Sequence, residues 1–290
     1  MNLSTQNARS GQRPPFAVVL GTNEIASAVA VKLFRSGFFV VLSHDPYPPV
    51  IRRKMAFHDA LFDDPVAIGG VKAKRADTGL DILAGLRPAC HEIMITELGL
   101  LDLIVLRTLD ALIDARMQKY QTTPDLRPLA RLTVGLGPGF CAGTNCDCAV
   151  ETRPAKTGLI IKQGATDPAD GIARNLGGIG PERFVYSPVP GRWHTAIEIG
   201  TRVFKDFIIG HLGSETVRAP FDGILRGVAR DGTEVPAGVK LLEIDPRGRR
   251  ASWSGIDKRS RMIASAVMKA IAMHQAKLAT PFQRTLTVVK

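Results

Sequence analysis

The sequence predicts an α/β fold, with a Rossmann-like N-terminal part, a small all-β unit after it and a C-terminal helix. Three observations predict this order. A strand–helix–strand pattern begins at residue 16, an internal repeat of 32 residues begins near residue 187, and apolar residues recur at helical spacing over residues 256–274. The chain has 290 residues, of which 45% are apolar. It is therefore long enough for about two domains and too apolar to be wholly disordered.

The opening pattern consists of two short apolar runs around an amphipathic segment. Residues 16–20 and 38–42 are continuous apolar runs, as in buried parallel strands. Between them, Ile25, Val29 and Leu33 lie at the spacing of one helix face. The pattern therefore predicts two parallel strands joined by a helix, as in a Rossmann-like unit.

The turn after the first run carries a degraded phosphate-binding fingerprint. Gly21, Asn23 and Ala26 occupy the places of a G-x-G-x-x-G/A pattern, and only the first is glycine. Asparagine tolerates a positive φ, and the start of a helix offers free N–H groups to an anion. Gly21 and Asn23 are therefore candidate cofactor-binding residues. A purely structural turn is the alternative, and it fits the degraded pattern better.

A cationic segment follows the second predicted strand. Arg52, Arg53 and Lys54 are adjacent and lie close to the first glycine turn in the predicted topology. Such a cluster could clamp a phosphate group, and a solvated surface is the alternative. We interpret the nearby His58 and Asp59 as packing or surface groups.

A glycine cluster over residues 135–143 follows a predicted strand at residues 132–134. Backbone without side chains can approach a ligand closely and can point N–H groups at an anion. No Lys-Ser/Thr pair follows, so the cluster is not a Walker A loop. We expect either a ligand-binding loop or a structural turn, with these candidate cofactor-binding residues: Gly135, Gly137, Gly139, Gly143 and, just beyond, Glu151.

Three cysteines lie in or next to this loop. Cys141, Cys146 and Cys148 have C-x4-C-x-C spacing, which is not that of a zinc knuckle. We interpret them as small buried apolar residues and assign no metal site. A role of Cys141 in sulfur or molybdenum chemistry is the alternative.

The internal repeat indicates an all-β unit. Residues 187–191 match residues 219–223, and the G-T-x-V sequence at residues 200–203 recurs at residues 232–235. Two related halves of short strands look like a barrel-sandwich hybrid of the biotinyl/lipoyl type. In such carriers the modified lysine lies on the hairpin between the halves, here residues 210–217, which contain no lysine. We therefore expect no covalent biotin or lipoate, and we interpret the unit as a docking or cofactor-cradling module.

The C-terminal segment is strongly basic. Residues 246–290 contain ten Lys or Arg residues and one Asp, in a chain of net charge +11. Cations at the predicted helix start oppose the helix dipole unless an anion lies there. Arg247 and Arg259 are therefore candidate residues for binding an anionic cofactor or partner, and a solvated basic helix is the alternative.

Composition excludes several classes of protein. Four cysteines make no disulfide framework, and aromatic residues are only 6% of the chain, so a nucleic-acid partner is not expected. The first fifteen residues have no apolar core of a signal peptide, and no apolar run is long enough to span a membrane. We therefore expect a cytoplasmic protein.

These observations divide the chain into four parts. We expect a disordered lead over residues 1–15 and a Rossmann-like α/β domain over residues 16–183. A lysine-free biotinyl/lipoyl-like barrel-sandwich hybrid over residues 184–246 and a basic C-terminal helix and tail over residues 247–290 follow.

Several of these motifs, taken together and in order, resemble one family. The chain is similar to the YqeB-like accessory proteins of selenium-dependent molybdenum hydroxylase systems, and the resemblance spans about residues 16–272. The residues that carry it include Ile51-Arg52-Arg53, Gly135-Leu136-Gly137-Pro138-Gly139-Phe140, Glu151-Thr152, Glu182-Arg183, Asp222-Gly223 and Asp245-Pro246-Arg247-Gly248.

The resemblance implies an accessory or maturation protein. Such a protein would bind an anionic cofactor, either molybdenum cofactor of pterin type or a nucleotide, and would assist a molybdenum-hydroxylase-type partner enzyme. The alternatives are a structural or docking subunit of a metabolic enzyme complex and a nucleotide-dependent enzyme. No histidine is paired by spacing with Ser or Cys, so the sequence identifies no catalytic residue. It leaves open whether a reaction is catalysed and whether the chain forms a homo-oligomer.

Overall fold

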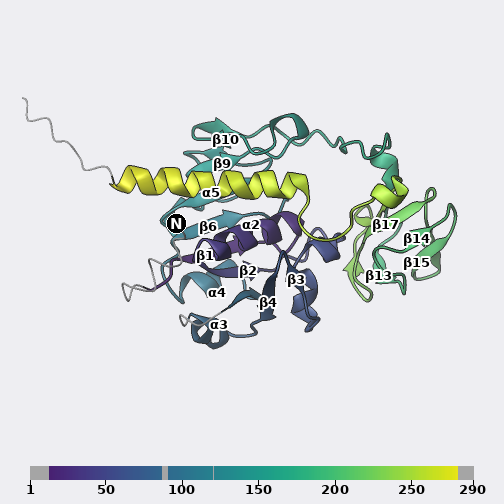
Figure 1. The fold of residues 1–290 in the computed structure, drawn as a ribbon, viewed down its shortest axis with the longest axis horizontal. Coiled ribbons are helices and arrows are strands. Elements are labelled where there is room, and N and C mark those ends of the chain that lie inside the picture. The colour runs from purple at the N-terminus through teal and green to yellow at the C-terminus, as the bar shows by residue number, and fades with distance from the viewer. Residues whose placement is uncertain (1–12, 87–90, 120, 280–290) are drawn as a thin grey trace, which may run out of the picture.

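The computed structural model of the protein describes residues 13–86, 91–119 and 121–279. Residues 1–12 of the expected disordered lead and residues 280–290 of the expected basic tail lie outside the described residues. Figure 1 shows one large sheet with helices packed on it and, beside it, a smaller β unit that contains β13, β14, β15 and β17.

The large sheet has nine strands in the order β10-β9-β7-β6-β1-β2-β5-β4-β3. The seven central strands are parallel, and β3 and β10 join the two edges antiparallel. The bounds are β1 Phe16–Leu20, β2 Phe39–Ser43, β3 Ala67–Ile68, β4 Val71–Arg75, β5 Glu92–Thr96, β6 Ala111–Asp114, β7 Thr133–Leu136, β9 Cys148–Val150 and β10 Ile160–Ile161.

Strands β1, β2, β6, β7 and β9 are buried on both faces, which explains their largely apolar sequences. Strand β4, nearer the edge, instead alternates between buried and exposed residues. Along β1, Ala17 and Val19 point into one core, while Phe16, Val18 and Leu20 point into the other. This alternation follows from the period of two along a strand. The two apolar layers hold the sheet between its helices.

Helices of different length cover the two faces. Helices α2 (Glu24–Arg35) and α5 (Lys258–Ala279) lie side by side on one face, as Figure 1 shows, and share one apolar core with the sheet. The short helices α3 (Gly79–Gly85) and α4 (Leu100–Ile104) contribute Ile82 and Leu103 to the core of the opposite face. The C-terminal helix therefore belongs to the same layer as the first helix of the chain.

The β unit consists of two four-stranded sheets, in the orders β12-β19-β17-β14 and β16-β15-β13-β18. Their bounds are β12 Phe184–Tyr186, β13 Gly191–His194, β14 Arg202–Val203, β15 Ile208–Leu212, β16 Glu215–Arg218, β17 Gly223–Val228, β18 Glu234–Val235 and β19 Lys240–Asp245. The lysine-free segment 210–217 lies in the β15–β16 hairpin.

The 32-residue repeat is visible in the strands of this unit. Strands β13, β14 and β15 begin 32 residues before β17, β18 and β19, respectively. The pairing repeats as well, because β13 pairs with β15 and β18, while β17 pairs with β19 and β14. The prediction of two related β halves is therefore confirmed.

The predicted fold class is nevertheless wrong. The large sheet is a mixed nine-stranded sheet with few helices, and the β unit is a pair of small sheets, so the described residues do not form a Rossmann-like domain followed by a barrel-sandwich hybrid. Between β2 and β7 the helical elements among the described residues are short helices and 3₁₀ turns, because no long segment there keeps an apolar helical period. The apolar face of the C-terminal helix packs against α2.

Two smaller features complete the fold. Strands β8 (Cys141–Ala142) and β11 (Gly164–Ala165) form an antiparallel pair beyond the end of β7. Within the described parts of the chain, no helix has the length and apolar character needed to cross a membrane.

Candidate functional site

The carboxyl ends of the central parallel strands form the edge at which the candidate residues gather. In open α/β sheets, ligands bind in the crevice beyond this edge, where connections leave neighbouring strands in opposite directions. Here β1 lies between β2 and β6, so the turns after β1 and β6 meet at such a point. We define the carboxyl edge as the residues that follow β1, β2, β6, β7 and β9.

The turn after β1 is held by contacts within the protein. Gly21 has φ +100°, and a Cβ there would lie 3.0 Å from the Ala115 carbonyl oxygen after β6. The Asn23 side chain donates to that same oxygen at 2.7 Å, and its Oδ1 caps α2 by accepting from the N–H groups of Ile25 and Ala26. The predicted site residues Gly21 and Asn23 therefore stabilise the turn itself.

The predicted glycine loop contains positions with different roles. A Cβ at Gly135 would lie 2.1 Å from the Phe140 ring, so this glycine makes room for packing. Gly137 has φ +87°, and its Cβ would lie 3.0 Å from Thr152 Oγ1. Gly137 therefore lies directly beside the turn that follows β9, where the absence of a side chain lets the two turns pack closely.

The remaining loop positions lie further along. Gly139 has φ +89° and its nearest neighbour is the Gln121 carbonyl oxygen, 3.8 Å from a built Cβ, whereas Gly143 has φ +85° and open space around it in the turn after β8. Glu151 is 1% exposed and accepts from the N–H groups of Thr152, Arg153 and Asp167. Its carboxylate therefore organises the backbone around Thr152.

Arg52 belongs to a buried network of charges between the large sheet and the β unit. Its guanidinium pairs with Glu24 at 2.8 Å and with Glu243 at 2.7 Å. Glu243 also accepts from Arg183 at 2.9 Å and lies 3.6 Å from Arg226. Burial by itself would lower the pKa of Arg52, but Glu243 and Glu24 raise it.

Glu243 is the anionic centre of this network. Its side chain is fully buried, and burial by itself would raise the pKa of its carboxyl group. Arg52 and Arg226 instead lower that pKa, so Glu243 stays ionised. Arg226 Nε is the one buried polar side-chain atom of the described residues that has no hydrogen-bond partner.

Arg259 lies at the carboxyl edge without a carboxylate of its own. Its Nη2 donates to the Thr152 carbonyl oxygen at 3.1 Å, and its side chain is partly buried. Among the described residues, no carboxylate oxygen lies within 4.0 Å of this guanidinium. Burial lowers the pKa of Arg259, Glu24 raises it and Arg52 lowers it further.

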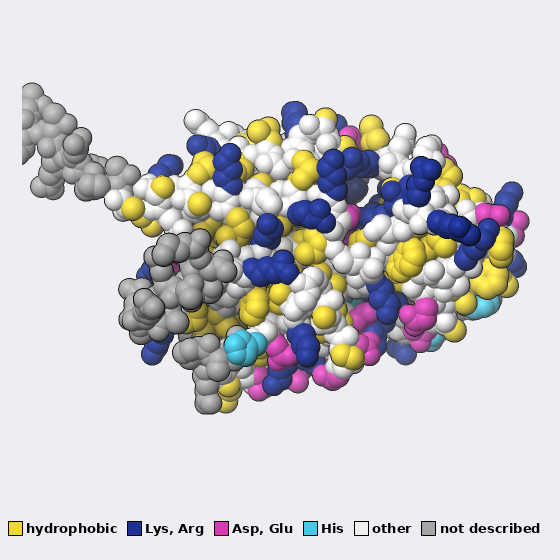
Figure 2. Space-filling model, in the orientation of Figure 1, with side chains coloured by type: hydrophobic (Ala, Val, Ile, Leu, Met, Phe, Trp, Pro, Cys, Tyr) yellow, Lys and Arg dark blue, Asp and Glu magenta, His cyan; other side chains and the backbone are white. Residues whose placement is uncertain are grey.

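The sequence suggested that the cations at the start of α5 need an anion to offset the helix dipole, and the structure shows a carboxylate there. Asp257 Oδ1 accepts from the Ser260 N–H at 2.8 Å, so a carboxylate caps the helix despite the cations beside it. Arg261 is exposed and donates to the Ile256 carbonyl oxygen. Of the two arginines in this turn, Arg259 contacts the carboxyl edge, and Arg261 does not. Figure 2 shows further Lys and Arg side chains distributed over the face that carries α5.

The other two predicted arginines lie in different surroundings. Arg247 pairs with Asp245 at 2.7 Å, and Arg53 pairs with Asp59 at 2.7 Å and donates to the Val228 carbonyl oxygen. Arg52 and Arg53 are adjacent in sequence but do not form one clamp, because Arg52 lies in the network around Glu243. Of the predicted cations, Arg52 and Arg259 are the two that approach the carboxyl edge.

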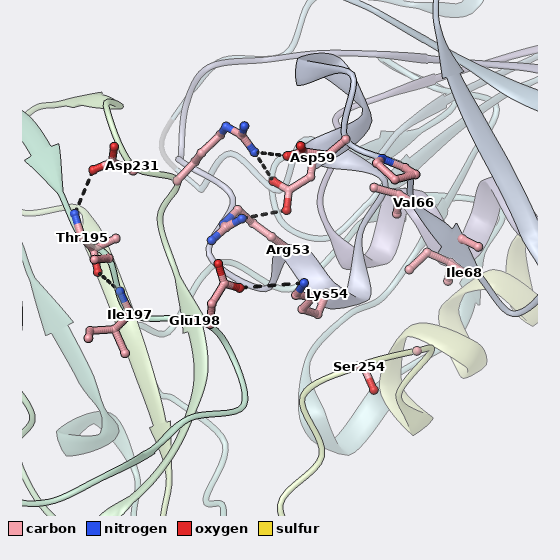
Figure 3. A pocket seen from close by; sticks show the side chains of 16 residues that line it. Arg53, Lys54, Asp59, Val66, Ile68, Thr195, Ile197, Glu198, Asp231 and Ser254 are labelled. Atoms are coloured by element: carbon pink, nitrogen blue, oxygen red, sulfur yellow. Dashed lines mark hydrogen bonds and ion pairs between the residues drawn. The ribbon is translucent and has the colours of Figure 1, made fainter.

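Arg53 lines a polar cleft of about 810 Å³ between the large sheet and the β unit. Figure 3 shows ion pairs across and along its walls, including Lys54 with Glu198 at 3.9 Å and Arg53 with Asp59. Arg230, another lining residue, pairs with Asp59 and with Asp64. The charges of this cleft are therefore largely balanced by one another, which distinguishes it from the surroundings of Arg259.

Sequence analysis missed a polar cluster at the carboxyl edge. Thr22 Oγ1 lies 3.2 Å from His44 Nδ1 and 3.1 Å from His58 Nδ1, and the two rings are 5.1 Å apart. One hydroxyl can donate only one hydrogen bond, so one ring accepts from Thr22 and the other donates to it. Burial lowers the pKa of His44 and, together with His44, Arg53 and Arg230, lowers the pKa of His58 to about 3. The sequence signal for Thr22 and His44 was their position just after two predicted strands, where the ligand sites of α/β sheets lie.

The cysteines of the glycine loop are free thiols. Burial raises the pKa of Cys146 to about 12 and that of Cys148 to about 11, so both stay protonated at neutral pH. The described residues contain no group of three or more His, Cys, Asp or Glu side chains arranged to hold a metal ion.

Comparisons with solved structures give only distant similarities. The apo structure of the ectoine utilization protein EutE (DoeB) from Ruegeria pomeroyi has a TM-score of 0.24 and 13% identity, with 81% of this chain and 86% of that chain covered. A succinylglutamate desuccinylase from Silicibacter sp. TM1040 has a TM-score of 0.24 and 13% identity, over 80% of this chain and 85% of that chain. Such TM-scores carry no argument about fold or activity.

Sequence comparison gives a stronger relationship. No protein-family model matches the chain. The uncharacterized protein YqeB from Escherichia coli (strain K12) is 32% identical over 268 residues. The match covers 91% of this chain and 49% of that relative, so this chain spans about half its length. This homology over most of the chain supports its assignment to a YqeB-like family.

Proposed function

We propose that the protein is an accessory protein that binds an anionic cofactor of pterin or nucleotide type and assists a molybdenum-hydroxylase-type partner enzyme. One observation carries the binding part of this proposal. Arg259 is a partly buried guanidinium at the carboxyl edge, and among the described residues it has no carboxylate within 4.0 Å. A bound phosphate or carboxylate would supply the missing negative charge.

The surroundings of Arg259 suit a phosphate-bearing group. Arginine can bind phosphate bidentately, and the Thr152 carbonyl oxygen uses only Nη2. Gly137 packs closely against the Thr152 side chain, so it helps to fix the backbone whose carbonyl oxygen holds the guanidinium. Arg52 also lies near Arg259 and lowers its pKa, but Glu24, which pairs with Arg52, raises that pKa more strongly. These residues fit the anionic part of the proposed cofactor.

The proposals of a partner enzyme and of a cellular location rest on other observations than the binding site. The molybdenum-hydroxylase partner is proposed from the resemblance of the motifs, including the glycine loop that contains Gly137. A cytoplasmic location is part of the same proposal, and the free thiols Cys141, Cys146 and Cys148 agree with a reducing compartment.

Calorimetric titration with inorganic pyrophosphate and with ADP tests the binding site. We expect Arg259→Gln to weaken binding by about 1–3 kcal/mol, the scale of a hydrogen bond to a charged group. Arg261→Gln is the matched control, because Arg261 lies two residues after Arg259 in the same helix, is exposed and carries the same charge. Mass spectrometry of the natively purified protein should detect a bound pterin or nucleotide. Equal losses in the two variants would contradict a specific site at Arg259.

A nucleotide-dependent enzyme is the second candidate, because Thr22, His44 and His58 bring two neutral histidines to the same edge. A histidine held in a defined tautomer is suited to general acid–base catalysis. Phosphate release from ATP or ADP tests this candidate. It predicts turnover that His44→Gln abolishes and His211→Gln, at an exposed position of the β unit, leaves unchanged. No release by the wild-type protein would exclude it for these nucleotides.

A further inference from the structure

Lys240 is the first residue of β19 and lies where the β unit approaches the large sheet. It is paired with Tyr186 of β12 in the sheet register. Its Nζ lies 3.7 Å from the centroid of the Phe184 ring and 6.0 Å from that of Tyr186. The side chain is partly buried, so its amine rests on two aromatic rings and remains in reach of solvent.

The amine of Lys240 lacks the usual partners of a lysine. Among the described residues, it makes no hydrogen bond and no carboxylate oxygen lies within 4.0 Å of it. The cationic Arg183 lies over the same Phe184 ring, 4.3 Å from its centroid. Aromatic faces attract a cation, but two cations at one ring repel each other.

These surroundings favour the neutral amine. Burial, together with the nearby cations Lys119 and Arg52, lowers the pKa of Lys240 to about 8, although Glu243 acts in the opposite direction. At pH 7, an amine of that pKa is neutral about 300 times more often than one at the ordinary value of 10.5. Desolvation beside other cations is the arrangement that activates nucleophilic lysines.

We infer that Lys240 is a nucleophilic amine that condenses with the aldehyde or ketone group of a small anionic molecule. The neutral Nζ uses its lone pair to form a bond to the carbonyl carbon. The carbonyl oxygen then takes up the two protons that the nitrogen loses and leaves as water, so that an imine joins the lysine and the ligand. The step needs no oxidant or reductant.

The neighbouring residues define the class of ligand. Lys119 is exposed and takes part in no ion pair of the described residues, so it can attract a carboxylate or phosphate on the ligand. Tyr186, which is 44% exposed, offers an apolar face for its carbon skeleton, whereas Phe184 is buried beneath Arg183 and Lys240. The site is thus suited to an acidic carbonyl compound. It is separate from the interaction of Arg259 with Thr152, so failure of one proposal leaves the other standing.

Reductive trapping of the full chain tests this inference. The protein is incubated at pH 7 with pyridoxal 5′-phosphate or with uncharged pyridoxal, reduced with borohydride and mapped by peptide mass spectrometry. Lys205, an exposed lysine of the β unit, is the internal reference. Nucleophilicity falls together with pKa, so the gain in rate is smaller than the gain in neutral amine. We expect Lys240 to be modified at least tenfold faster than Lys205, and faster by the phosphorylated aldehyde than by pyridoxal.

Variants and pH complete the test. Lys240→Arg should lose the fast modification, and the matched Lys205→Arg should keep it; circular dichroism verifies that both variants fold. The rate at Lys240 should rise up to about pH 8 and then level off, following its pKa. Equal rates at Lys240 and Lys205, or a rate that still rises steeply from pH 8.5 to pH 10, would overturn the inference. Faster modification by pyridoxal than by its phosphate would overturn the anionic class of ligand.

Discussion

Arg52 and Glu243 are 191 residues apart in sequence and form two hydrogen bonds, from Nε to Oε2 at 2.7 Å and from Nη2 to Oε1 at 3.2 Å. The pair fastens β19 of the β unit to the segment that follows β2. Because Glu24 also accepts from Arg52, the same guanidinium reaches the first turn of α2. The carboxyl edge and the β unit are therefore held in one arrangement by charge.

Replacing the central carboxylate should destabilise the protein strongly. Glu243→Gln leaves Arg52, Arg183 and Arg226 buried with less negative charge around them. We expect the free energy of unfolding in urea to fall by about 3–5 kcal/mol, as when one member of a buried ion pair is removed. Glu234→Gln removes the exposed partner of Arg192 and should cost about 0–1 kcal/mol. Similar losses in the two variants would mean that the network contributes little.

The buried histidine should make stability depend on pH. The pKa of His58 is about 3 in the folded protein and near 6.5 in the unfolded chain, so the unfolded state binds the extra proton first. Stability is complete above pH 6.5 and falls as the pH decreases toward 3. By pH 4.5 the wild type should have lost about 2–3 kcal/mol more than His58→Gln.

Urea unfolding at several pH values between 4.5 and 7.5 measures this difference. His211→Gln, which removes an exposed histidine, is the control and should follow the wild type. If His58→Gln loses as much stability as the wild type over this range, His58 is not buried in its neutral form.

Alanine substitutions at two glycines of the same loop should distinguish the effect of backbone strain on stability from an effect on ligand binding. Gly137 and Gly143 have φ values of +87° and +85°, so an alanine at either position should cost about 1–2 kcal/mol of stability. Only at Gly137 would the new Cβ approach a neighbour, Thr152 Oγ1 at 3.0 Å. We expect Gly137→Ala to lose more stability than Gly143→Ala because of this contact, and only Gly137→Ala to bind pyrophosphate more weakly. Unchanged binding by Gly137→Ala would assign the loop a purely structural role.

The two functions of the Asn23 side chain can be measured separately. Asn23→Ala removes both the cap of α2 and the hydrogen bond to the Ala115 carbonyl oxygen, whereas Asn23→Asp keeps an acceptor at the helix start. We expect a loss of about 0.5–2 kcal/mol for the missing cap. The urea midpoint should therefore fall further for the alanine variant than for the aspartate variant. The reverse order would show that repulsion between the new carboxylate and the Ala115 carbonyl oxygen outweighs the cap.

The local elements were predictable from the sequence because neighbouring residues decide them. The apolar runs at residues 16–20 and 38–42 became β1 and β2, and helical spacing over residues 256–274 became α5, which begins at Lys258. The 32-residue repeat likewise fixed where the strands of the β unit begin. Periodicity and turn residues act over a few positions and leave a trace in the sequence.

The candidate site was only partly predictable. Gly137, Arg52 and Arg259 were chosen as residue types that suit an anion, and the structure brings them to one edge of the sheet. Nothing in the spacing distinguished Arg53, which pairs with Asp59, from Arg52. Lys240 could not be predicted from the sequence, because its environment is made by β12, Arg52 and Lys119, which lie in distant parts of the chain.

Sequence alone determined β1, β2, β7, α2, α5 and the 32-residue repeat, since each depends on residues close together in the chain. The tertiary structure decided the mixed nine-stranded sheet, the return of α5 onto α2 and the pairing of Arg52 with Glu243. It also brought Thr22, His44 and His58 into one hydrogen-bonded cluster. The physical reason is that an ion pair or a buried histidine obtains its partner and its low dielectric from segments far away in the chain, and their meeting depends on the whole path of the backbone.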